Sequence, residues 1–272
     1  MTALRPAALA FDAIAPIFDT RFGEWQSVAA QRRAVRLALL RAFPKGGCVL
    51  ELGGGTGEDA MWLAQRGFRL LLTDVSPAMT EVAQGKLAPF GSHTEVVAAE
   101  DLDQFAERYL EAGGALFDGA FSNFAPLNCV EDLTPVARGL ARLTKPGSSA
   151  VLVLFGIASP GEILVECLRG RPGQAFRRFR RDAVPARLGT RHFAVTYHRG
   201  HALAHAMQPW FRPVKKLGIG IFVPPSAAEP WISCHPRLLA LLERMDRIAA
   251  RSFAMFGDHI LYQFERTAVA AP

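Results

Sequence analysis

The sequence is poor in cysteine and has no apolar run long enough to cross a membrane. Its four cysteines are far apart and form no Cys-x-x-Cys pair: Cys48, Cys129, Cys167 and Cys234. This pattern excludes a disulfide framework and indicates no zinc site, so we expect reduced thiols and a cytoplasmic location. No stretch reaches the roughly 18 uninterrupted apolar residues of a transmembrane helix, so any membrane contact would be peripheral.

Several catalytic motifs are absent as well. The chain contains no G-x-S-x-G, no G-x-x-x-x-G-K-[ST] and no H-E-x-x-H. These patterns are typical of serine hydrolases, P-loop nucleotide hydrolases and zinc peptidases, respectively. We therefore expect none of these three chemistries and no bound metal.

Acidic residues are scarce in the second part of the chain. Residues 156–272 hold 17 basic and 8 acidic residues, whereas residues 1–155 hold 14 and 17, so the net charge of +6 comes from the C-terminal part. The densest basic cluster consists of Arg169, Arg171, Arg177, Arg178, Arg180, Arg181, Arg187 and Arg191. It could contact phosphate, an anionic lipid surface or RNA. The alternative is a solvated helix face, and no RNA-binding module accompanies the cluster.

What the sequence does have is a regular alternation of strands and helices. After predicted helices at 8–22 and 24–43, the pattern gives strands 48–52, 68–73, 95–98, 117–122 and 149–155, with helices 58–66, 77–88, 101–112 and 131–143 between them. Such alternation is typical of a parallel sheet covered on both faces. Beyond Phe155 we predict helices 160–182, 200–207 and 229–250 and strands 192–197, 213–223 and 259–265.

The first strand leads directly into a glycine-rich turn. Glu51 is followed by Gly53, Gly55 and Gly57, and a helix begins at Glu58. Glycine lets the backbone turn sharply and lets a ligand come close, and the free N–H groups of a helix N-terminus suit an anionic group. The dinucleotide fingerprint G-x-G-x-x-G fails in both registers, because Thr56 and Glu58 stand where glycine is required. Nicotinamide-dependent redox chemistry is therefore disfavoured.

An acidic residue ends the second strand. Asp74 lies about 20 positions past the glycines, where an α/β fold of this kind places a carboxylate against the ribose hydroxyls of a nucleotide. A carboxylate accepts two hydrogen bonds from a vicinal diol. The other interpretation of the loop is a tight turn whose glycines serve only the backbone.

These residues together resemble the first motifs of the class I S-adenosylmethionine (AdoMet)-dependent methyltransferases, in the small-molecule, "type 11"-like branch. The resemblance implies a Rossmann-like, seven-stranded doubly wound α/β sheet with antiparallel C-terminal strands and a helical insertion. It implies AdoMet as the cofactor. Residues 1–155 would form the helical lid and cofactor core, and residues 156–272 would shape the substrate site and complete the same domain.

The resemblance also implies which residues hold the cofactor. The loop would hold the amino-acid end of AdoMet, Asp74 the ribose, and Met79 with residues 100–102 the adenine. Asp101 could instead merely cap the following helix. The full cofactor set implied is Glu51, Gly53, Gly54, Gly55, Gly57, Asp74, Val75, Met79, Glu100, Asp101, Leu102, Ser122 and Asn123.

Other residues are candidates for contact with the acceptor. Phe11 and Phe18, each followed by aspartate, resemble a Tyr-Asp lid of small-molecule methyltransferases, although they could simply pack on the core. Phe124 and Tyr197 would border the acceptor. Methyltransferases that act on base amines or glutamine amides usually carry a Pro-Pro-aromatic motif after the fourth strand. This chain has Asn123-Phe124-Ala125-Pro126 there, which argues against those substrates.

Histidines offer weak candidates for a general base. His198 and His201 lie near Tyr197, and His201 is four residues before His205. A structural role for them is the other interpretation. We therefore predict a methyltransferase acting on a small, apolar or aromatic molecule. An RNA or protein methyltransferase that uses the arginine cluster and a non-catalytic AdoMet-binding module remain the alternatives.

Overall fold

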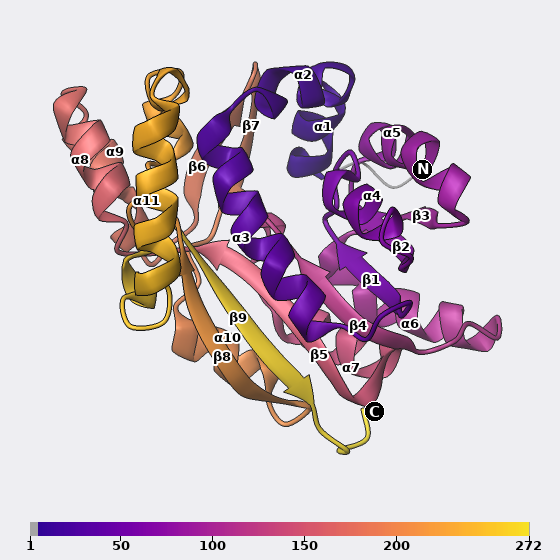
Figure 1. Cartoon of the computed structure of the whole chain (residues 1–272). Helices are drawn as coiled ribbons and strands as arrows, with labels where there is room; N and C mark the ends of the chain where they lie inside the picture. The colour runs from indigo at the N-terminus through magenta and orange to yellow at the C-terminus, as the bar shows by residue number, and fades with distance from the viewer. Residues whose placement is uncertain (1–4, 272) are drawn as a thin grey trace.

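A seven-stranded sheet forms the centre of the fold in the computed structural model, which describes residues 5–271. The strand order is β3-β2-β1-β4-β5-β9-β8 (Figure 1). The strands are β1 (Cys48–Leu52), β2 (Arg69–Asp74), β3 (His93–Val96), β4 (Phe117–Ser122), β5 (Thr144–Phe155), β8 (Phe211–Ile219) and β9 (His259–Arg266). The first five run parallel, and β9 is antiparallel to β5 and β8. The predicted doubly wound sheet with antiparallel C-terminal strands is confirmed.

Helices cover both faces because alternate residues of each strand point in opposite directions. Val49 of β1 packs with α3 (Gln26–Ala42), α4 (Glu58–Ala64) and α5 (Pro77–Leu87). Its neighbour Leu50 packs on the other face with α6 (Leu102–Glu111), α7 (Thr134–Leu143) and α10 (Gly200–Met207). The two cores meet only through the sheet, so the carboxyl ends of β1, β2 and β4 are left open as a single edge.

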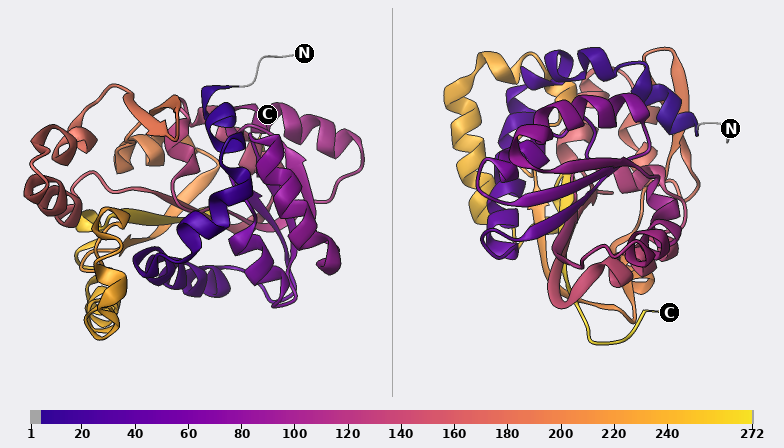
Figure 2. Two further views of the ribbon diagram at one scale, coloured as in Figure 1. Left: turned by 90° about the horizontal axis from the view of Figure 1, so that it is seen from above. Right: turned by 90° about the vertical axis from the view of Figure 1, so that its right-hand side faces the viewer.

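The N-terminal segment is a broken helix, not the continuous one predicted over 8–22. It consists of α1 (Pro6–Asp12), the 3-10 turn η1 (Ala15–Ile17) and α2 (Phe18–Gly23). Pro16 stands at the start of η1 and has no N–H to continue the helical pattern. This break sets α1 and α2 at an angle beside α5, over the carboxyl ends of the strands (Figure 2).

The region after β5 differs most from the prediction. The helix expected over 160–182 is three pieces: α8 (Pro160–Leu168), α9 (Pro172–Ala175) and η5 (Arg177–Phe179). Gly170 has a positive φ of 69° and Pro172 follows it, which ends α8. An unpredicted strand β6 (Val184–Leu188) pairs with β7 (Arg191–Val195) as a separate two-stranded sheet.

The remaining elements lie near their expected places. The helix α11 (Pro236–Ala249) starts later than predicted, because the turn η7 (Ile232–Cys234) precedes it. Short 3-10 turns complete the fold: η2 (Ala88–Phe90), η3 (Ala99–Asp101), η4 (Pro126–Cys129), η6 (Ser226–Ala228) and η8 (Ala254–Phe256). Within residues 5–271, no helix combines the length and the apolarity needed to span a bilayer.

Candidate functional site

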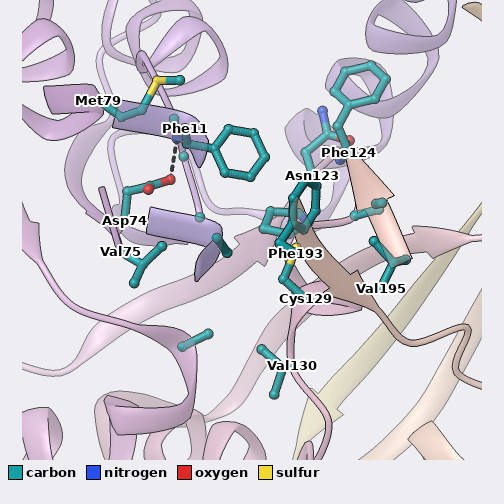
Figure 3. A pocket seen from close by; sticks show the side chains of 18 of the residues that line it. Phe11, Asp74, Val75, Met79, Asn123, Phe124, Cys129, Val130, Phe193 and Val195 are labelled. Carbon is teal, nitrogen blue, oxygen red and sulfur yellow. Dashed lines mark hydrogen bonds between the residues drawn. The ribbon is translucent and has the colours of Figure 1, made fainter. Parts of the chain in front are cut away.

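A cavity of about 490 Å³ lies at the carboxyl edge of the sheet. Most of the predicted site residues line it: Phe11, Phe18, Glu51, Gly53, Gly54, Gly55, Asp74, Val75, Met79, Glu100, Asn123, Phe124 and Tyr197. Figure 3 shows Asp74, Val75 and Met79 on one side of the cavity and Phe193 and Val195 on the other. Glu51, Asp74 and Asn123 meet here because each stands where a strand of the sheet ends at this edge. Phe11 and Phe18 come from the N-terminal segment, and Tyr197 follows the β6–β7 hairpin.

The glycine loop after β1 has a backbone that other residues would not adopt. Gly53 has a φ of 63°, and a Cβ there would lie 2.2 Å from Cβ of Pro126. A Cβ on Gly54 would lie 2.4 Å from Cδ1 of Leu72 and 2.9 Å from Cδ of Glu51. The loop is therefore packed against its supports on one side, and its other side borders the cavity as bare backbone.

Asp74, the last residue of β2, is tied to this loop. Its Oδ2 accepts a hydrogen bond from the N–H of Gly55 at 2.8 Å (Figure 3). Its Oδ1 accepts one from the N–H of Ser76 at 2.9 Å. Burial raises the pKa of Asp74, while the Ser76 and Gly55 hydrogen bonds oppose that rise. The carboxylate is thus fixed in place with acceptor capacity remaining on both oxygens.

Glu51 is a buried carboxyl group with an unused oxygen at the floor of the cavity. Its side chain is 2% exposed, and its Oε2 has no hydrogen-bond partner. Burial raises the pKa of Glu51 well above its usual range; the Asp59 carboxylate adds to the rise, and Arg32 opposes it. A buried polar atom without a partner is costly, so this oxygen has the surroundings of a group that meets a polar ligand.

A charged network supports the wall beside Glu51. Asp59, at the start of α4, accepts hydrogen bonds from Nε of Arg36 at 2.6 Å and from Nδ2 of Asn123 at 2.7 Å. Arg32 lies 3.8 Å from Oδ2 of Asp59, and its guanidinium stands 5.0 Å from the centroid of the Phe124 ring. The amide nitrogen of Asn123 is therefore already hydrogen-bonded within the wall, whereas Arg32 brings a positive charge to the cavity.

The N-terminal segment is latched onto the loop by its two aspartates. Asp12 accepts a hydrogen bond from the N–H of Ala78, and Asp19 accepts one from the hydroxyl of Thr56 at 2.6 Å. Asp19 also pairs with Lys86 at 2.6 Å. The phenylalanines before them, Phe11 and Phe18, line the cavity. The segment thus places apolar rings over the cavity and anchors them with charged groups.

The far wall is apolar and comes from β4, β5 and the β6–β7 hairpin. Phe124 and Ala125 both have positive φ, 57° and 66°, a strained backbone at the exit of β4. Phe155 of β5 packs against Tyr197 with ring centroids 5.8 Å apart, and Phe193 packs against Phe11 at 5.8 Å. This wall presents rings and aliphatic side chains where the opposite side presents carboxylates and backbone.

Two polar side chains interrupt the apolar wall. The Nε of Arg177 is buried without a partner, while its Nη2 pairs with Oε1 of Glu162 at 2.7 Å. Burial raises the pKa of the Tyr197 hydroxyl, and the charges of Arg177 and Arg178 oppose that rise. The Tyr197 hydroxyl therefore stays protonated at neutral pH. Cys129 also lines the cavity, but burial raises its pKa to about 12, so its thiol stays protonated as well.

Six predicted site residues do not line the cavity, four of the cofactor set and the two histidines. Leu102 belongs to the core under α6, and Ser122 is fully buried at the end of β4. Gly57 begins α4 with a φ of 79° and packs against Ala83. Asp101 accepts hydrogen bonds from Nη2 of Arg5. All four lie near lining residues in sequence. Nevertheless, the side chains of Leu102 and Ser122 are buried and that of Asp101 pairs with Arg5, while Gly57 has no side chain to reach the cavity.

The two histidine candidates also lie away from the cavity. His198 uses its Nε2 in a 2.8 Å hydrogen bond with the carbonyl of Val130, and burial lowers its pKa. His201 is exposed on α10, next to β8 and β9. Among residues 5–271 no histidine lines the cavity, and no cluster of histidine, cysteine or acidic residues there could hold a metal ion.

The arginine cluster is not one solvated helix face. Arg178 is 5% exposed and pairs with Glu162 and, at 2.7 Å, with Asp258. Its Nη1 also donates to the carbonyls of Gly156 and Asp258. Arg178 thus ties the region after β5 to the start of β9.

Sequence reasoning missed several residues of the cavity. The most important are Arg5, Arg32, Asp59, Cys129, Phe155, Arg177 and Val195. The place of Asp59 could be predicted, because an acid in the first turn of the helix behind a glycine loop lies near that loop. The place of Arg32 could not, since its helix carries several arginines at similar spacing.

Comparison with known proteins shows similarity to methyltransferases. A family model described as "Methyltransferase domain" matches residues 49–147. A malonyl-[acyl-carrier protein] O-methyltransferase of Serratia marcescens is 28% identical over 153 residues, which cover 56% of this chain and 54% of that protein. The chain thus spans about half the length of this curated relative.

Solved structures share the fold over nearly the whole chain. The CcbJ methyltransferase of Streptomyces caelestis has a TM-score of 0.59 at 14% identity, covering 95% of this chain and 98% of that one. The 1,6-didemethyltoxoflavin-N1-methyltransferase of Burkholderia thailandensis has a TM-score of 0.51 at 18% identity, covering 96% and 88%. The matched residues contain the entire glycine loop and the strand that ends at Asp74, so residues 49–147 carry the cofactor part of a methyltransferase domain of the AdoMet-dependent kind, whose cofactor is AdoMet.

Proposed function

We propose that this chain transfers a methyl group from AdoMet to a small acceptor that is mainly apolar or aromatic. The observation that carries the proposal is the cavity itself, which has a charged wall and an apolar wall facing each other. Its volume of about 490 Å³ falls within the range of small-molecule sites. Because AdoMet shares this space, only a small acceptor, or the end of a larger one, would fit beside it.

The charged wall fits AdoMet. We propose that the bare loop backbone and the free Oε2 of Glu51 receive the amino-acid end of the cofactor, with Arg32 facing its carboxylate. Asp74 would accept hydrogen bonds from the ribose, and Val75, Met79 and Glu100 would border the adenine. When bound, AdoMet supplies an electrophilic sulfonium methyl group. Gly57, Asp101, Leu102 and Ser122 would then act as supports and not as contacts.

The apolar wall fits the acceptor. Phe124, Phe155 and Phe193 would hold an aromatic or aliphatic body, and Phe11 and Phe18 of the N-terminal segment would exclude water from it. The free Nε of Arg177 and the hydroxyl of Tyr197 would orient one polar group of the acceptor. In this division of labour the described residues of the 1–155 part hold the cofactor and also supply Phe124 and Phe155 to the acceptor site, which residues of the 156–271 part, such as Phe193 and Tyr197, complete.

Catalysis would rest on positioning. The carboxyl groups that line the cavity all lie on the cofactor wall, and the polar side chains of the acceptor wall include Tyr197, Arg177 and Cys129. We therefore propose that the chain aligns the acceptor atom and excludes water, which can lower a barrier by several kcal/mol. The acceptor would reach the site already nucleophilic, without proton removal by His198 or His201.

The alternative of an RNA or protein substrate has less support. Its sequence argument was the arginine cluster, and two of those arginines are committed to Glu162 and Asp258. The tied Asp74 and the packed loop argue against a module that has lost cofactor binding, and the apolar wall facing the cofactor wall favours turnover over AdoMet binding alone.

Methyl transfer from labelled AdoMet to a panel of small aromatic and aliphatic molecules tests the proposal. We expect label in a small organic product, and we expect Phe193→Ala to raise the acceptor KM while leaving AdoMet affinity unchanged. Phe90→Ala, a change at an exposed aromatic residue away from the cavity, serves as the matched control. Label found only in added RNA or protein would overturn the proposed substrate class.

A further inference from the structure

The helix α11 exposes an apolar stripe that no part of the described chain covers. Leu238, Leu241, Met245 and Ile248 are spaced by three or four residues, which places them along one side of the helix. All four are exposed, and Ile248 is 78% exposed. Leu239 points the other way and packs with Ala30 of α3. The helix therefore has two apolar sides, of which only one is used by the core.

The charges of α11 are sorted by sign. Arg237, Arg244 and Arg247 are exposed at positions beside the apolar stripe. The acids are turned inward: Glu243 pairs with Arg33 of α3, and Asp246 accepts a hydrogen bond from the N–H of Phe222 at 2.6 Å. The outside of this helix is therefore apolar and positive, with its negative groups neutralised against the core.

The segment α8–η5 repeats this arrangement. Leu164 and Leu168 are exposed on α8, and Leu168 is 79% exposed. Glu162 and Glu166, four residues apart, are both buried on the opposite side. Phe176 and Phe179, at the end of the segment, are also exposed. A second stretch of chain thus turns its acids inward and its large apolar side chains outward.

The same segment contributes more positive charge. Arg169, Arg171, Arg180 and Arg181 are exposed, and Asp182 is the one exposed acid between residues 160 and 182. In both Figure 1 and the left view of Figure 2, α8 and α11 lie on the same side of the molecule. We call the exposed side chains of α8–η5 and α11 the outer face.

We propose that the outer face docks on the surface of an anionic phospholipid membrane. Apolar side chains flanked by arginines match the two parts of such a surface, the acyl boundary and the negative headgroups. A second copy of this chain would set arginine against arginine and is disfavoured. An RNA would neutralise the arginines but would leave Leu168 and Ile248 in water, since RNA is bound through phosphates and aromatic stacking.

The docked membrane would lie next to the acceptor side of the cavity. Arg177, which lines the cavity, is the first residue of η5 and lies in sequence between the exposed Phe176 and Phe179. Docking itself does not depend on the proposed acceptor, because it can be measured without acceptor or cofactor. Failure of one proposal therefore leaves the other to be judged on its own result.

The test is co-sedimentation of the full chain with two kinds of vesicle, pure phosphatidylcholine and phosphatidylcholine containing phosphatidylglycerol. We expect binding to the mixed vesicles that weakens as salt is raised. Ile248→Glu or Leu168→Glu should weaken the partition coefficient about tenfold. Each of Arg244→Gln and Arg247→Gln should weaken it about fivefold. Leu168 and Ile248 are both exposed, so the glutamate variants should fold normally. Thermal unfolding checks this.

Matched controls come from the other side of the sheet. Val96→Glu on β3 places the same charge at an exposed apolar position, and Arg108→Gln on α6 removes an exposed arginine. Both should bind the mixed vesicles as the parent chain does. If Ile248→Glu and Leu168→Glu bind the mixed vesicles as tightly as the parent chain does, the proposal is overturned. A stable dimer that Ile248→Glu dissociates, or tight RNA binding with no vesicle binding, would also overturn it.

Discussion

The two walls of the cavity are made in different ways. The cofactor wall comes from residues 51–79, where a loop and a strand end follow each other closely in sequence and the loop backbone does much of the work. The apolar wall comes from β4, β5 and the β6–β7 hairpin, where side chains from distant segments meet. One wall therefore depends on local geometry, and the other on how a long insertion packs onto the sheet.

The two walls are also held by different forces. Asp74 is fixed by hydrogen bonds to Gly55 and Ser76, which are local in the fold. The insertion is fixed through Arg178, whose buried guanidinium joins Glu162 of α8 to Asp258 at the start of β9. The difference implies that a single substitution can disable the acceptor wall while leaving the cofactor wall intact.

The largest expected effect follows from breaking that buried ion cluster. Arg178→Ala would leave Asp258 buried without the guanidinium that pairs with it, and Glu162 with Arg177 alone; breaking a buried ion pair typically costs about 3–5 kcal/mol. We expect the free energy of unfolding, measured in urea, to fall by that amount. Below the denaturation midpoint, the folded variant should keep AdoMet affinity and lose acceptor turnover.

The pH dependence of this effect has a definite sign. Arg178 and His259 hold the pKa of Asp258 below its usual range although burial opposes them. A carboxyl group whose pKa is lower in the folded chain than in the unfolded chain stabilises the fold at pH values above its unfolded-state pKa. That stabilisation is lost as the pH falls through the folded-state pKa. The difference between the parent chain and Arg178→Ala should therefore shrink in acid. Arg180→Ala, at an exposed neighbour, is the control, and an equal loss there would refute the buried-cluster argument.

The contrast between the walls also explains what the sequence could predict. The doubly wound sheet, the glycine loop and Asp74 follow from short motifs and from alternation, which act over a few residues. The helix break at Gly170 and the β6–β7 hairpin are also local, but the apolar and basic pattern of residues 160–188 does not distinguish them from a continuous helix. The pairing of Arg178 with Asp258 joins residues 80 positions apart, which no short motif encodes. Nothing in the run of arginines distinguishes the buried Arg178 from its exposed neighbour Arg180.

The next largest effect belongs to the cofactor wall. Asp74→Ala would remove the acceptor for the ribose hydroxyls, and hydrogen bonds to a charged group contribute about 1.5–3 kcal/mol. Isothermal titration should therefore show AdoMet affinity lower by roughly tenfold to a hundredfold. Asp101→Ala makes the same change at a carboxylate that pairs with Arg5 and does not line the cavity. If the two variants lose affinity equally, the proposed role of Asp74 is wrong.

A smaller effect is expected at Glu51, where a substitution should raise the free energy of unfolding instead of lowering it. Because its pKa is raised in the fold, the unfolded chain ionises first as pH rises, and the fold is destabilised at neutral pH. Glu51→Gln removes that penalty, so the free energy of unfolding at pH 7 should rise by on the order of 1 kcal/mol. The gain should vanish below about pH 4, near the pKa of an unfolded glutamate.

The same Glu51→Gln variant should bind AdoMet more weakly, because its amide cannot provide the negative charge that suits the cofactor's amino group. Urea unfolding across pH and calorimetry on the same samples measure both changes. Thr73→Val, at a buried hydroxyl of β2 that is bonded to the carbonyl of Glu51, is the structural control. A variant that gains stability and keeps full AdoMet affinity would show that Glu51 does not contact the cofactor.

The smallest effect should be found at the polar end of the apolar wall. Tyr197→Phe removes one hydroxyl and keeps the ring that packs against Phe155. Because the hydroxyl stays neutral and would make a single hydrogen bond, its loss is worth about 0.5–1 kcal/mol, which corresponds to a two- to fivefold higher acceptor KM. AdoMet affinity should not change, since the cofactor wall is untouched. An unchanged KM with a lower AdoMet affinity would reverse the assignment of the two walls, and would require the acceptor to approach from the side of Asp74.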